Sequence, residues 1–208
     1  GGLIVAIISN AVTIADAGAF SASLGSMTLI KTLTASSSST VSFVHGSSDV
    51  VLDSTYPIYV FKFIDIHGAD NAQLGFQANA AGASGYNETV TSTYFRAFHT
   101  EADNSASLSY DTGRDQAQGT GFIEIISDFG GDNDACGVGT LHLFNPSSTT
   151  FVKHFMVTSS NYARSNAARN MHVAGYFNTA SAIDEIQFKM DSGNIDSGTI
   201  KLYGIKDS

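Results

Sequence analysis

Apolar and polar residues alternate along several segments of this chain, and this alternation restricts its fold more than any other feature. In residues 183–190, IDEIQFKM, the apolar residues Ile186, Phe188 and Met190 are each separated by one polar residue. Successive side chains of a β-strand point to opposite faces, so these three residues share one face. The segment is therefore predicted to be a strand with one buried face and one face in water.

Three other segments also show patterns that predict strands, and the patterns differ from one segment to the next. Residues 141–157, LHLFNPSSTTFVKHFMV, predict a hairpin in which NPSSTT turns and Leu141 and Leu143 face the core. Residues 94–100, YFRAFHT, fit a strand or a helical turn, and we favour the strand. Residues 58–66 are apolar on both faces, which is typical of a central strand buried on both sides or of one with an oligomer contact behind it. Its two predicted faces are Tyr59, Phe61 and Phe63 on one side and Ile58, Val60, Ile64 and Ile66 on the other.

The end of the chain completes this pattern. Residues 192–205, SGNIDSGTIKLYGI, predict a turn followed by a strand with Ile200 and Leu202 facing inward. Gly193 and Gly198 supply the positive φ angles that such a connection requires. Together the patterns give about nine or ten strands and no long helix, which predicts an all-β, antiparallel β-sandwich, jelly-roll-like in type.

The amino-acid composition is typical of a protein made of many short strands. The net charge also argues against some classes of binding partner. Only 14% of the residues are charged, whereas 43% are hydrophobic and 20 are glycine. Long surface helices would need more Glu, Lys, Arg and Gln. The net charge of −9 argues against binding to nucleic acid or to an anionic membrane. Cys136 is the only cysteine, so the chain cannot form an internal disulfide.

Residues 1–26 differ from the rest and are predicted to be an extended N-terminal arm or assembly segment, with the sandwich domain covering residues 27–208. Their apolar run is too short for a signal peptide or a membrane span, and no basic residue precedes it. Two interpretations stay open: an arm that packs on a neighbouring subunit, or the first two strands of the domain itself. An arm predicts a homo-oligomer, with a trimer as the first expectation, whose assembly contacts are Leu3, Ile4, Val5, Ile7 and Ile8.

Candidate metal and catalytic groups are present but incomplete. His142 and His154 flank one hairpin, but catalytic zinc usually takes three protein ligands. Asp128, Asp132 and Asp134 lie on a Gly-rich stretch whose spacing does not match an EF-hand calcium loop, so a solvated turn is expected. We predict no catalytic residue, no metal site and no cofactor. Carboxylate pairs that a glycosidase would need also occur, but nothing distinguishes them from other acidic residues: Glu101/Asp103 and Glu124/Asp128.

Three long segments carry a family resemblance. Residues 53–69, DSTYPIYVFKFIDIHGA, residues 141–157 and residues 174–205, AGYFNTASAIDEIQFKMDSGNIDSGTIKLYGI, together resemble a family of virion structural proteins of tailed phages of marine bacteria, including cyanobacteria. The resemblance covers most of residues 27–205. It implies a non-enzymatic particle component, exposed on the capsid or tail and oligomeric, and it carries over no functional residue.

These observations lead to one expected function, two alternatives and one further class, an enzyme. We expect a capsid decoration or head-associated protein, located in the virion and assembled in the host cytoplasm, whose partners are major capsid or tail proteins. A tail or tail-fibre component is the related alternative. The second alternative is a carbohydrate-binding, receptor-recognition module, and the third class considered, a glycan depolymerase, lacks a catalytic motif. The candidate glycan contacts are Tyr86, Tyr94, Tyr110 and Tyr162.

Overall fold

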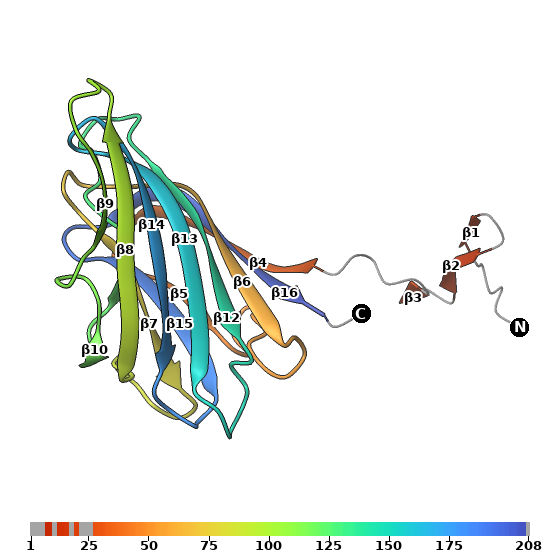
Figure 1. The fold of residues 1–208 in the computed structure, drawn as a ribbon. Helices are drawn as coiled ribbons and strands as arrows, with labels where there is room; N and C mark the ends of the chain where they lie inside the picture. The colour runs from red at the N-terminus through yellow and green to blue at the C-terminus, as the bar shows by residue number, and fades with distance from the viewer. Residues whose placement is uncertain (1–6, 10–11, 17–18, 21–26, 207–208) are drawn as a thin grey trace, which may run out of the picture.

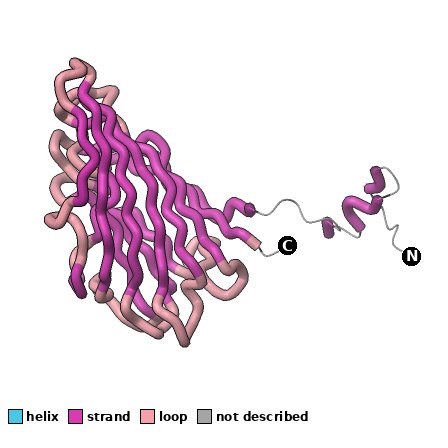
Figure 2. Tube along the Cα trace, viewed as in Figure 1, coloured by secondary structure: helices cyan, strands magenta, loops and turns pink. Residues whose placement is uncertain are grey.

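A computed structural model describes residues 7–9, 12–16, 19–20 and 27–206, and it confirms the all-β prediction (Figures 1 and 2). The described residues form strands, turns and loops without a helix, so none of them belongs to a helix that could cross a membrane. The strands of the domain are arranged in two antiparallel sheets. The jelly-roll subclass stays a prediction.

The larger sheet contains nine strands in the order β10-β8-β14-β13-β12-β6-β16-β4, with β9 paired to β8. Figure 1 shows β8, β14, β13, β12 and β6 side by side across the sheet. The strand bounds are β4 (Met27–Ser38), β6 (Ile58–Gly68), β8 (Val90–Thr100), β9 (Ala106–Tyr110), β10 (Ala117–Gly119), β12 (Gly137–Phe144), β13 (Lys153–Ala163), β14 (Ala167–Phe177) and β16 (Ile195–Ile205).

The smaller sheet contains four strands in the order β11-β7-β15-β5. The chain alternates between the sheets, because β5, β7, β11 and β15 each lie in sequence between strands of the larger sheet. Each sheet buries one face against the other, which makes the domain a β-sandwich. The strand bounds are β5 (Val41–Val44), β7 (Leu74–Ala80), β11 (Ile123–Ile126) and β15 (Ile183–Met190).

Aromatic side chains fill the space between the sheets. Phe188 of β15 lies at the centre, with its ring centroid 5.4 Å from that of Phe61 and 5.3 Å from that of Phe63. Phe43 and Phe76 each lie 6.2 Å away, and Phe188 itself is fully buried. The alternation in residues 183–190 therefore identified the buried face of this strand correctly.

A bulge in β6 overturns one part of the predicted face assignment. Tyr59, Phe61 and Phe63 face the core as expected, but Ile66 does so too and is fully buried. The pairing of β6 with β12 shifts register at this point, and Asp65 adopts a positive φ of 51°. An extra residue in one strand reverses the side-chain alternation beyond it, so Ile66 moves from the predicted outer face to the inner one.

The last strand, β16, lies inside the larger sheet, next to the edge strand β4, and pairs with both β4 and β6. Ile200 and Leu202 point into the core, as the alternation predicted. Gly193 and Gly198 have φ angles of 71° and 121°, in the region that side chains disfavour. A Cβ atom at Gly198 would also come within 2.7 Å of the backbone of Ile66, so this glycine permits the close approach of β16 to the β6 bulge.

Three short strands precede the sandwich domain, which begins with β4 at Met27. β1 (Ile7–Ser9) pairs antiparallel with β2 (Val12–Asp16), and β2 pairs with β3 (Ala19–Phe20). The predicted contacts Ile7 and Ile8 therefore lie on β1. The other three, Leu3, Ile4 and Val5, lie outside the described residues.

Candidate functional site

An ionic cluster joins two loops to the inner side of the larger sheet. Arg114, in the loop before β10, donates from Nε to Asp111 at 3.1 Å and from Nη2 to Asp128 at 3.3 Å. It also donates to Glu124 of β11. Arg169 of β14 donates to Asp128 as well. The cluster thus ties the loops before β10 and after β11 to a strand of the larger sheet.

Burial changes the acidity of two carboxyl groups in this cluster in opposite directions. Burial raises the pKa of Glu124 to about 7, although Arg114 acts against the rise. Burial also acts to raise the pKa of Asp128, but Arg169, Arg114 and Arg96 together outweigh it and leave that pKa below its ordinary value. A perturbed carboxyl group can mark a functional site, but ion-pair networks within a core produce the same shift.

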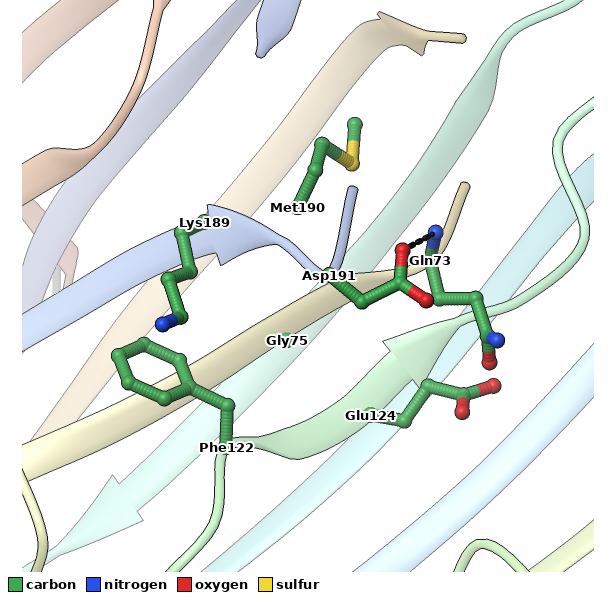
Figure 3. Close-up of a pocket in the computed structure, with 7 residues that line it drawn as sticks. All are labelled: Gln73, Gly75, Phe122, Glu124, Lys189, Met190 and Asp191. Atoms are coloured by element: carbon green, nitrogen blue, oxygen red, sulfur yellow. Dashed lines mark hydrogen bonds between the residues drawn. The ribbon is translucent and has the colours of Figure 1, made fainter. Parts of the chain in front are cut away.

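A small pocket lies beside Glu124 on the smaller sheet (Figure 3). The side chain of Asp191 closes one end and accepts a hydrogen bond of 2.9 Å from the backbone N–H of Gln73. At the other end the Lys189 ammonium lies 4.1 Å from the ring centroid of Phe122. The cavity has a volume of about 100 Å³, whereas ligand sites usually need about 300 Å³ or more. It has room for water molecules, and Glu124 is already engaged with Arg114.

The residues considered as metal ligands do not gather into one site. Within residues 27–206 and the described part before them, the structure contains no group of three or more His, Cys, Asp or Glu side chains placed to hold a metal ion. Asp128 is bound by arginines. His142 stacks near Phe144, with ring centroids 6.3 Å apart, while His154 lies against Tyr176.

The four tyrosines proposed as glycan contacts have different surroundings. Tyr94 is fully buried and its hydroxyl donates to Ser127 Oγ at 3.1 Å, so it is not available to a ligand in the folded protein. Tyr110 is 50% exposed on β9, whereas Tyr86 and Tyr162 are partly buried. Tyr94 therefore cannot serve as a glycan contact, because its side chain points inward from β8.

The outward side of the larger sheet, which we call the outer face, carries most of the exposed apolar side chains. Nine large hydrophobic residues are exposed in the described part of the chain, and eight of them lie on this face. Phe151, in the loop before β13, is the ninth. The eight residues are Met27, Leu29, Ile64, Phe95, Leu108, Tyr110, Val138 and Met156.

The central part of the outer face also lacks outward Asp, Glu, Lys and Arg side chains. Strands β8, β12, β13 and β14 contain no Asp or Glu, and their only Lys and Arg residues, Arg96, Lys153 and Arg169, point to the inner side of the sheet. Lys153 is fully buried and donates to the backbone oxygens of Phe151 and Thr179 at 2.6 and 3.2 Å. We call the outward side of these four strands the charge-free patch.

The surface of the charge-free patch contains two hollows bordered by larger side chains. A hollow of about 450 Å³ has Thr93 and Ala174 in its lining, and Phe144, Met156 and Tyr176 border it. A second hollow of about 300 Å³ is lined by Thr140 and Thr158, among others. The patch is therefore wide, shallow and free of Asp, Glu, Lys and Arg, which suits a docked surface better than a small enclosed ligand.

The charge-free patch was only partly foreseeable. The apolar residues on both faces of residues 58–66 indicated an oligomer contact as one explanation, and this strand does expose Ile64 on the outer face. The neighbouring strands gave weaker signals, because their outward residues are mainly Thr, Ala and His. Of the ionic cluster, the sequence indicated only the carboxylate pair Glu124/Asp128, and the arginines were missed because only the fold brings them to these carboxylates.

Comparison with known proteins found no relative of this chain. No family model, no curated protein and no solved structure matches it. The resemblance to virion structural proteins therefore rests on the sequence motifs alone, and membership of that family stays a prediction.

Proposed function

We propose that this chain is a non-enzymatic structural component of a tailed-phage particle, a capsid decoration or head-associated protein. The observation that supports this proposal best is the concentration of eight exposed apolar residues on one sheet face. Monomeric proteins rarely expose contiguous apolar patches of more than a few hundred Å², and larger ones mark interaction surfaces. A protein whose most distinctive surface is a docking face fits an assembly role.

The sequence motifs indicate that the assembly in this proposal is a phage particle. Residues 53–69, 141–157 and 174–205 resemble virion structural proteins, and they form the strands that carry the core and much of the outer face. The partners in this proposal are other virion proteins, such as a major capsid protein, and its location is the virion.

Purified particles of the phage that encodes the chain test this proposal. Mass spectrometry of the particles should detect the protein at a constant ratio to the major capsid protein. Gold-labelled antibody should then mark the head in electron micrographs; label on the tail would instead indicate a tail or tail-fibre component. Absence of the protein from purified particles would exclude both positions.

A carbohydrate-binding module is the second candidate, supported by Tyr162. This side chain lines an open hollow with His99, Glu101 and Ala168. Aromatic rings and neighbouring polar groups are suited to sugar recognition. A glycan array should show binding that Tyr162→Ala abolishes and that Tyr203→Ala, on a distant strand, leaves unchanged. An array without binding would count against this candidate.

A further inference from the structure

The distribution of charge on this protein suggests what covers its outer face. The chain carries a net charge of −9, so two copies repel each other over most of their surfaces. The charge-free patch has no outward Asp, Glu, Lys or Arg. It is therefore a region where two copies can approach without placing carboxylates against each other. Depletion of charged residues, with aromatic residues and Met retained, is also typical of the buried centre of protein interfaces.

The area of the charge-free patch is close to that of a standard interface. Three of its four strands, β8, β13 and β14, are 11 residues long, and β12 has eight residues. With strands about 4.8 Å apart and a rise of about 3.3 Å per residue, the four strands cover roughly 650 Å². Specific protein interfaces bury about 600–1,000 Å² on each partner, so the patch lies at the lower end of that range.

The surface shape of the patch, with both a projecting side chain and hollows, is also compatible with self-association. An interface around a two-fold axis must be self-complementary, because the same surface lies on both sides. The projecting side chain of Met156 lies beside hollows lined by small residues such as Ala174 and Thr158. Each copy therefore offers both the knobs and the hollows that such an interface needs.

We propose that two copies of this chain pack face to face through the charge-free patch, larger sheet against larger sheet. The inference rests on the docking role proposed above for the outer face. It identifies the partner that covers this face as a second copy of the chain. A two-fold pairing of this kind gives a dimer, or a larger assembly of dimers, instead of the trimer expected from the arm.

Sedimentation velocity of the full chain tests the pairing between about 1 and about 100 µM. The wild-type protein should sediment with twice the mass of one chain. Met156→Glu places a charge in the patch and should weaken association at least about tenfold. Phe151→Glu is the matched control, because Phe151 is an exposed apolar residue outside the patch, and it should leave association unchanged. Thr158→Glu, at an exposed position on β13, should act like Met156→Glu.

Circular dichroism and urea unfolding should show that all three variants remain folded, since each changes an exposed side chain. Raising NaCl from about 0.05 to about 0.5 M should preserve or strengthen the dimer, because salt screens the repulsion between the acidic copies. A monomeric wild type, equal effects of Met156→Glu and Phe151→Glu, or dissociation in high salt would each overturn the inference. A monomer that is nevertheless found in purified particles would refute the pairing and leave the proposed function standing.

Discussion

Replacing Phe188 with alanine should remove the centre of the hydrophobic core. The ring is fully buried and lies within 6.2 Å, centroid to centroid, of four other phenylalanine rings. Truncating a buried Phe costs about 3–5 kcal/mol, through lost transfer energy and the cavity left behind. Favourable aromatic pairs add about 0.5–1.5 kcal/mol each beyond area burial. With four such neighbours we expect a loss of about 5 kcal/mol, at the upper end of the range for truncation.

Urea unfolding followed by circular dichroism measures this loss directly. The two sequence neighbours of Phe188 are matched controls on the opposite face of the same strand. Gln187 donates to Ser42 Oγ at 3.0 Å, and Lys189 contacts the ring of Phe122, so alanine at either position should cost about 1 kcal/mol or less. Equal losses at all three positions would refute the assignment of faces in β15.

Three further outcomes are expected. Glu124→Gln should become increasingly stabilising relative to wild type as pH rises, because burial raises the pKa of Glu124 from 4.5 to about 7 and its ionisation costs folding free energy across that window. The difference in unfolding free energy should grow by up to about 3 kcal/mol between pH 4.5 and 7, and a constant difference would contradict this reasoning. EDTA should leave the melting temperature unchanged, and a fall of several degrees would reveal a metal site. Deleting residues 1–26 should leave the sandwich domain folded with cooperative unfolding but abolish attachment to the particle, whereas failure to fold would assign the segment to the core.

The alternating segments allowed much of the fold to be predicted. Residues 186–190 and 141–143 place their apolar residues on the inner face as expected, because an uninterrupted strand fixes which side chains share a face. The prediction failed at Ile66, because the bulge at Asp65 depends on pairing with β12. Tyr94 was misplaced for a related reason, since its strand was recognised but its inward direction was not.

The sequence by itself determined the all-β class, the turns with glycine at positive φ, and the inner face of the most regular strands, because these depend on local alternation and local backbone sterics. The tertiary structure alone decided the features that depend on long-range pairing. It brought Arg114, Glu124, Asp128 and Arg169 together from separate loops and strands. It also placed β8, β14, β13 and β12 side by side, and only this order of strands joins their uncharged outward residues into one patch.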